Sequence, residues 1–118
     1  MANGKFSRTD GYAAVMQMAR SGLLKPGEGA LYDGKGIDSI IALNDVMAIG
    51  AMTALRANGI EPGREIGVTG FGDIPHSADV FPPLTTVHLP LAEMGQAAVD
   101  SILSTAMTGR PPAALPTA

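Results

Sequence analysis

The chain has 118 residues, enough for one ordinary domain, and 46% of them are hydrophobic while 16% are charged. This apolar content, with a net charge of only −3, excludes an intrinsically disordered chain. The absence of cysteine excludes a disulfide scaffold and a cysteine zinc site, and eight Lys and Arg residues leave no basic stripe for direct nucleic-acid binding.

The first predicted helix covers residues 8–21. Ser7 and Asp10 have the spacing of a capping box, good helix formers follow them, and Gly22 favours termination. The next segment, residues 23–36, is rich in glycine and predicts a long loop.

Part of this predicted loop imitates a phosphate-binding loop through Gly29, Gly34 and Lys35. However, Gly36 occupies the place of the Ser or Thr that would hold magnesium, and the segment precedes a strand. We therefore interpret it as a surface loop and not as a nucleotide site.

Residues 38–70 predict a strand, a helix and a second strand. The run 38–43 is β-prone without alternation, which is typical of a parallel strand covered on both faces. A helix follows over 46–58 and a strand over 65–70, and the crossover between the strands should be right-handed. The predicted fold class is therefore α/β, with a three-layer open parallel sheet.

The helix predicted over 46–58 is apolar on all sides, because no charged residue follows Val46 until Arg56. A helix of this kind must be covered all round, and one sheet covers only one side. We favour a subunit interface through Val46, Ile49, Gly50 and their neighbours, and the alternative is a further helix of the same chain.

The last third of the chain predicts a loop over 71–83, a third strand over 84–89 and a helix over 90–107. An apolar stripe at helical spacing marks this helix, consisting of Leu91, Met94, Ala98 and Ile102. The Pro/Ala-rich tail, 111–118, is expected to be extended.

Groups that could support catalysis or hold a metal are sparse. His76 and His88 are the only histidines. Asp79 stands three residues after His76, but a zinc site needs three or four ligands and nothing nearby supplies the others. The serines lack the context of a nucleophile elbow. The sequence predicts no enzyme, no metal and no cofactor.

Glycines follow the second predicted strand at Gly67, Gly70 and Gly72, as they would in a dinucleotide-binding fingerprint. No helix is predicted directly behind them, so we interpret them as sites of close backbone approach.

Polar residues follow two predicted strands. Asn44 and Asp45 come after the first strand, and Asp73 comes shortly after the second. Because parallel strands end at the same edge of a sheet, these residues predict a small polar-ligand site there. The alternative is that Asn44 or Asp45 only caps the following helix.

The runs 41–51, 67–75 and 82–95, in this order, resemble the lactose-repressor (LacI/GalR) family of bacterial transcription regulators. Gly4 to Ser7, followed by Gly11 and Tyr12, resembles the segment that precedes these runs in the family. The match spans most of residues 4–110.

The resemblance implies part of a type I periplasmic-binding-protein-like domain. Residues 1–80 would correspond to the C-terminal lobe, 81–110 to a crossover strand and helix that pack in the other lobe, and 111–118 to the tail. The implied function is effector sensing and dimerisation, with the helix-turn-helix DNA-binding domain absent from this chain. Alternatives are a sugar-binding protein of a transporter or a small α/β enzyme with a site at the sheet edge.

The resemblance also implies ligand-binding residues. Phe6 matches an aromatic residue that packs on the effector, and Asn44 matches a polar contact to it. Where the family has an aspartate for sugar hydroxyls, this chain has Gly72, with Asp73 one place later. The implied effector is a sugar or a nucleoside, and the helix over 46–58 matches a dimer-interface helix.

Two further expectations concern surroundings and packing. No stretch reaches the roughly 18 apolar residues of a membrane span, and the N-terminus has no apolar core of a signal peptide, so we expect a cytoplasmic protein. The helix over 90–107 should pack either on residues 4–80 or on another copy of the chain.

Overall fold

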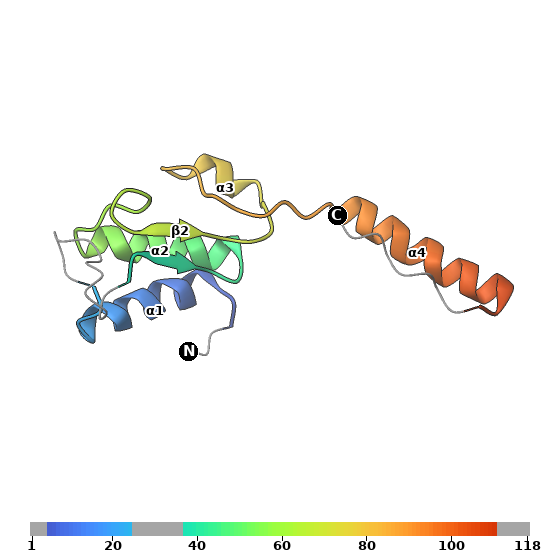
Figure 1. Cartoon of the computed structure of the whole chain (residues 1–118), viewed down its shortest axis with the longest axis horizontal. Coiled ribbons are helices and arrows are strands. Elements are labelled where there is room, and N and C mark those ends of the chain that lie inside the picture. The colour runs from blue at the N-terminus through green and yellow to red at the C-terminus, as the bar shows by residue number, and fades with distance from the viewer. Residues whose placement is uncertain (1–4, 25–36, 111–118) are drawn as a thin grey trace. The chain divides into compact units, whose positions relative to one another are not determined.

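The computed structural model describes residues 5–24 and 37–110 and divides the chain into two units, Met1–His88 and Leu89–Ala118. The predicted loop over 25–36, with its resemblance to a phosphate-binding loop, and the tail over 111–118 lie outside the described residues. Within the described ranges, no helix is long and apolar enough to cross a membrane. The elements in chain order (Figure 1) are α1 (Arg8–Arg20), β1 (Ser39–Ile41), α2 (Asp45–Ala57), β2 (Gly67–Thr69), α3 (His76–Asp79) and α4 (Leu91–Thr108).

The predicted strand–helix–strand unit is present. β1 and β2 pair in parallel, with Ile40 opposite Val68, and α2 connects them. Both strands are shorter than expected, but the α/β class with a parallel sheet is confirmed.

The predicted third strand is represented by isolated bridges on the other side of β2. Thr69 pairs with Thr85, and Gly72 pairs with His88. The pairing does not continue beyond the second bridge, where the chain turns: Gly72 has a φ of 125° and Asp73 a φ of 55°. This pairing places residues 84–88 with the first unit.

Only one face of this small sheet is covered in the described part of the first unit. Ala42, Val68 and Leu84 point into the core and are buried. On the opposite face, Ile41 is 81% exposed and Leu43 is 66% exposed. Within the described residues the first strand is therefore covered on one face, because α1 packs on α2 and adds to the same core.

Helix α1 begins as the sequence predicted. The Ser7 hydroxyl accepts a hydrogen bond from the backbone N–H of Asp10 at 3.2 Å, and the Asp10 carboxylate accepts one from the Ser7 N–H at 3.0 Å. These two bonds form the capping box. Gly22, with a φ of 80°, follows the end of the helix.

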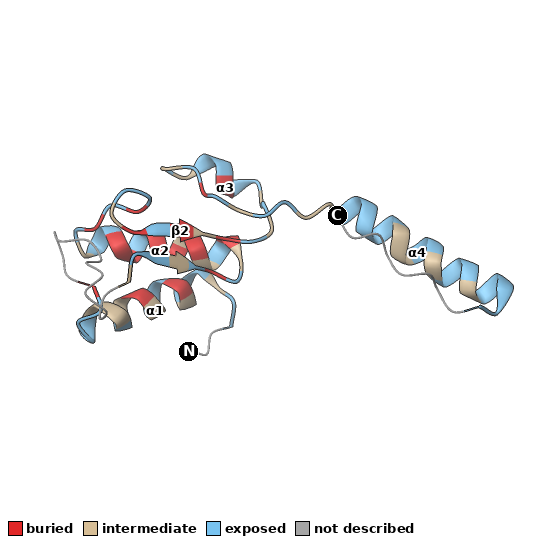
Figure 2. Ribbon diagram, in the orientation of Figure 1, coloured by how far each residue is buried: buried red, intermediate tan, exposed pale blue. Residues whose placement is uncertain are grey.

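Helices α1 and α2 touch backbone to backbone through two glycines. A Cβ atom at Gly50 would lie 2.0 Å from the carbonyl oxygen of Arg8, and one at Gly11 would lie 2.0 Å from that of Met47. In Figure 2 the buried residues gather along α2 and α1. The close contact explains why both positions lack a side chain.

The expected subunit interface needs correction at one of its residues. Gly50 is buried against α1 of the same chain, so a further helix of the chain, the alternative from the sequence, covers this side of α2. Val46 remains 37% exposed and Ile49 half-buried on another flank of the helix.

The second unit, described by itself, consists of one long helix. α4 matches the helix predicted over 90–107 and ends at Gly109, whose φ is 69°. None of its residues is buried. Its exposed apolar side chains are Leu91, Met94, Val99, Ile102, Leu103 and Met107.

The glycine contact predicts a large stability effect at one position. Gly50→Ala should lower the free energy of unfolding by about 1–3 kcal/mol or more, because the helices must separate to admit a methyl group. Urea denaturation followed by circular dichroism measures this change. Gly67→Ala is the matched control, since a Cβ there would lie 3.7 Å from its nearest neighbour. Equal midpoints for the two variants would contradict the proposed backbone contact.

Candidate functional site

Asn44 lies where β1 ends and α2 begins, and its side chain bonds in two directions. Its Oδ1 accepts a hydrogen bond from the backbone N–H of Met47 at 2.8 Å, which makes Asn44 the N-cap of α2. Its Nδ2 donates to the carbonyl oxygen of Phe6 at 3.0 Å. The capping role is therefore confirmed, and Asn44 also joins the segment before α1 to the edge of the sheet.

Phe6 adopts an unusual backbone conformation beside Asn44. Its φ is 61°, in the left-handed region that residues with a side chain seldom occupy. The hydrogen bond from Asn44 holds its carbonyl group, and the neighbouring Lys5 N–H donates to the Asp10 carboxylate at 2.8 Å. The aromatic residue is 58% exposed, so its ring is accessible at this edge.

Asp45 is the most deeply buried charged group of the described residues, with no exposed surface. Its Oδ2 accepts hydrogen bonds from the Ser77 hydroxyl at 2.5 Å and from the Ile74 N–H at 2.9 Å. Its Oδ1 accepts one from the Thr86 hydroxyl. The carboxylate thus ties the start of α2 to the segment around α3 and to the strand-like segment 84–88.

The sequence placed Asp45 at the sheet edge but missed this role. Ser77 and Thr86 are 32 and 41 residues away along the chain, so no local spacing reveals the pairing. The one local signal is Gly70, since a Cβ there would lie 2.3 Å from the Asp45 Oδ1. The interpretation of this glycine as a site of close approach is confirmed. The same interpretation is wrong for Gly67 and Gly72, where a Cβ would lie 3.7 Å from its nearest neighbour and in open space, respectively.

The hydrogen bonds set the charge state of Asp45. Burial alone raises its pKa, but the bonds that the carboxylate accepts from two hydroxyls and from backbone N–H groups outweigh burial. The pKa of Asp45 therefore lies below its ordinary value, and the group is a carboxylate at neutral pH.

Asp73 lies on the same edge, after β2. Its carboxylate is 2.9 Å from the His88 Nδ1, and its backbone N–H donates to the Thr86 hydroxyl at 3.2 Å. The Asp73 and His88 side chains are 44% and 72% exposed. Thr86 therefore connects Asp73 to Asp45.

Of the predicted ligand-binding residues, the structure joins Phe6 and Asn44 directly. Asp73 is joined to Asp45 and His88, and no hydrogen bond links it to the other two. His76 and Asp79 stand at the two ends of α3. The described residues contain no group of three or more His, Asp or Glu side chains that could hold a metal ion.

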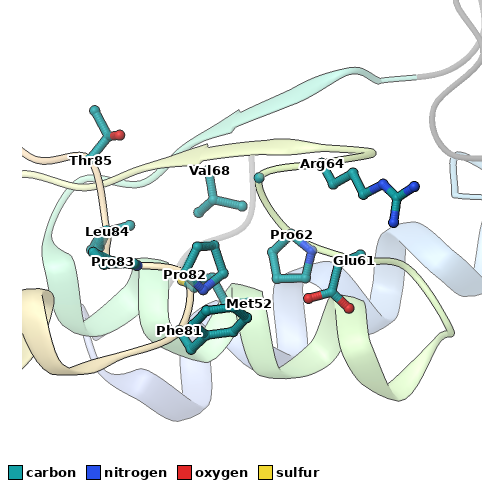
Figure 3. Close-up of a pocket in the computed structure, with 11 residues that line it drawn as sticks. Met52, Glu61, Pro62, Arg64, Val68, Phe81, Pro82, Pro83, Leu84 and Thr85 are labelled. Carbon is teal, nitrogen blue, oxygen red and sulfur yellow. The ribbon is translucent and has the colours of Figure 1, made fainter.

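A hollow of about 700 Å³ lies away from this edge (Figure 3). It is formed mainly by residues 61–64, which precede β2, and by residues 81–85, together with Met52 of α2 and Val68 of β2. Met52, Pro62, Phe81 and Leu84 give it a largely apolar lining. No sequence motif pointed to this hollow, because its residues come from a helix and two separate loops.

Comparison with known proteins gives a consistent result. A family model described as "Periplasmic binding protein-like domain" matches residues 4–117. The HTH-type transcriptional regulator MalR of Streptomyces coelicolor is 41% identical over 70 residues, which cover 59% of this chain and 20% of that protein. The lactose operon repressor of Escherichia coli is 32% identical over 100 residues, which cover 85% of this chain and 24% of that protein.

Solved structures agree with these matches. The chain resembles a lac repressor dimer bound to operator and the anti-inducer ONPF, with a TM-score of 0.75 and 31% identity over 88% of this chain and 32% of that one. A regulatory protein of the LacI family from Chloroflexus aggregans gives a TM-score of 0.72 with 32% identity. The chain spans a fifth to a quarter of the length of the curated relatives named above.

The Asp45 network predicts a pH-dependent stability difference. Asp45→Asn should lower the free energy of unfolding by about 1–3 kcal/mol at neutral pH. The NH₂ group of the new side chain would face hydrogen-bond donors and could not accept from them. Because the pKa of Asp45 is lower in the folded chain than its ordinary value of 3.8, the carboxylate stabilises the fold at pH values above 3.8. This stabilisation is lost as the pH falls from 3.8 through the lowered pKa. The difference between the two proteins should therefore be constant above about pH 5 and shrink towards pH 3.

Urea titrations at several pH values measure this difference. The bond from Ser7 also lowers the pKa of Asp10, but both proteins contain Asp10, so its effect cancels in the comparison. Asp73→Asn is the exposed control. A difference that persists unchanged at pH 3 would contradict the account of the network.

Proposed function

Because this chain belongs to the periplasmic-binding-protein-like domain family, and within it to the LacI/GalR regulators, we propose that it is the effector-sensing and dimerisation part of a transcription regulator. The observation that supports this proposal is the edge of the sheet after the carboxyl ends of β1 and β2. Asn44 bonds to Phe6 at this edge, and Asp73 lies on the same edge. Ligands of open parallel sheets bind at this edge. The proposed part is a sensor in the cytoplasm and not an enzyme.

The chemistry of this edge suits a small polar effector. The Asn44 amide has two N–H donors, and one of them is used by Phe6. The exposed Asp73 carboxylate can accept hydrogen bonds from hydroxyl groups, and the accessible Phe6 ring can pack on the face of a sugar or a base. We propose a sugar or a nucleoside as the effector class.

Gly72 distinguishes this chain from the pattern of its family. Its φ of 125° disfavours any residue with a side chain, and no heavy atom lies within 4 Å of the position of a Cβ. The space above Gly72 is therefore open, and Asp73 supplies the carboxylate from the next position.

The proposed dimer uses the exposed flank of α2. Val46 is partly exposed and Ile49 is half-buried, and both lie in the first two turns of the helix. A solved relative is described as a dimeric lac repressor. Because Asn44 caps the same helix that carries this flank, an effector contact at Asn44 would act directly on the dimer surface, which is the coupling that a sensor needs.

Calorimetric titration of the chain with a panel of sugars and nucleosides tests the proposed function. One ligand should bind saturably, and Asp73→Ala should weaken its binding about 10-fold or more, since it removes a charge-assisted hydrogen bond. Asp79→Ala, an exposed aspartate on α3, is the matched control and should bind as the unmodified chain does.

A second variant separates the ligand contact from helix capping. Asn44→Asp keeps a good N-cap but loses the amide donor, including the bond to the Phe6 carbonyl, so it should lose affinity while α2 remains capped and helical by circular dichroism. Turnover of any ligand, or binding that is indifferent to both edge variants, would overturn the proposal.

A further inference from the structure

Asp73 and His88 form a pair at the sheet edge, and the proposed function uses only the first of them. The Asp73 Oδ2 lies 2.9 Å from the His88 Nδ1. Among the described residues, His88 is the one basic side chain within ion-pair distance of this carboxylate. The role of His88 therefore has to follow from this contact.

The backbone holds the two side chains next to each other. The N–H of Gly72 donates to the carbonyl oxygen of Val87 at 2.9 Å, and the N–H of Asp73 donates to the Thr86 hydroxyl at 3.2 Å. Gly72 and His88 are also bridge partners. Asp73 has a φ of 55°, a conformation that aspartate tolerates better than most residues. The fold, and not the chance meeting of two surface side chains, therefore places Asp73 beside His88.

The carboxylate determines which imidazole nitrogen of His88 carries the proton. An ionised carboxylate only accepts hydrogen bonds, so the Nδ1 must be the donor in this contact. A neutral imidazole has one N–H group, and its other nitrogen is an acceptor. Neutral His88 therefore directs its Nδ1–H at Asp73 and keeps a lone pair on Nε2.

The pair as a whole then offers two hydrogen-bond acceptors. One is the His88 Nε2, and the other is the Asp73 Oδ1, which accepts no hydrogen bond from the described residues. Hydroxyl groups can donate to both atoms, whereas a carboxylate or phosphate group has no donor for either. A site that accepts from hydroxyls discriminates against analogues that lack them, because its polar groups then stay unpaired.

We propose that His88 is a further specificity-determining residue of the effector site, and that its Nε2 and the Asp73 Oδ1 accept from two different hydroxyl groups of one ligand. This inference rests on the proposed function and narrows the effector class to compounds with at least two hydroxyl donors. Asp73 then acts twice: it binds one hydroxyl itself, and it holds the tautomer of His88 that binds the other.

Nitrogen NMR of the full, isotope-labelled chain tests the tautomer without any ligand. At about pH 8.5, where imidazole is neutral, His88 should be protonated on Nδ1. Asp73→Ala should lower the population of this tautomer in His88 and leave His76 unchanged, and His76→Asn assigns the signals of the two histidines. If His88 of the unmodified chain is protonated on Nε2, the inference is wrong, while the proposed function stands.

Calorimetry with glucose, galactose, ribose and adenosine tests the contact to the ligand. For a probe that binds, His88→Asn should lower the affinity about 10-fold, because the new amide keeps a donor near the place of Nδ1 but has no atom in the place of Nε2. His76→Asn makes the same change at the exposed histidine of α3 and should bind as the unmodified chain does. Circular dichroism melts check that both variants fold.

Monodeoxy analogues of the same probes identify the hydroxyl that His88 binds. One analogue should bind about 10-fold more weakly than its parent to the unmodified chain, but as well as its parent to His88→Asn, since the two changes remove the same bond. If every analogue loses equal affinity for both proteins, His88 makes no ligand contact and the inference is wrong. If none of the probes binds, the proposed function fails and this inference fails with it.

Discussion

The buried carboxylate of Asp45 accepts hydrogen bonds from two segments that lie far from it in the sequence, the one around α3 and residues 84–88. The sheet is short, and residues 84–88 join it only through isolated bridges. Asp45 adds to these backbone bonds, because Ser77, Ile74 and Thr86 all donate to it. Such a network is stable only while every oxygen is satisfied, since an unpaired buried charge is costly. The position of Asp73, and with it the geometry of the proposed effector site, depends on this one side chain.

Local sequence signals predicted the helices well. The capping box of Ser7 and Asp10, the Asn44 cap and the glycine at 109 all act between residues close in sequence, so their spacing is visible in the chain. Long-range pairing was not visible in the same way. The choice of α1 as the cover for α2 depends on two glycines 39 positions apart, and the sequence alone favoured a subunit interface.

The sequence predicted where the candidate site lies but not which hydrogen bonds its side chains make. The order of strands and polar residues put Asn44, Asp45 and Asp73 on one edge, and the structure has them there. Whether each side chain faces solvent or the interior depends on partners elsewhere in the chain. Asp45 turned inward to three donors, whereas Asp73 remained exposed beside His88. Composition and periodicity do not distinguish these two aspartates.

The backbone contact between Gly11 and Gly50 has a consequence for motion. Neither helix can slide along the other, because each carbonyl group already occupies the space that a passing side chain would need. A displacement that begins at the Asn44 end of α2 would therefore move α1 together with α2. Phe6, which precedes α1 and is bonded to Asn44, would move in the same step, so the proposed ligand contacts and the two helices would move together.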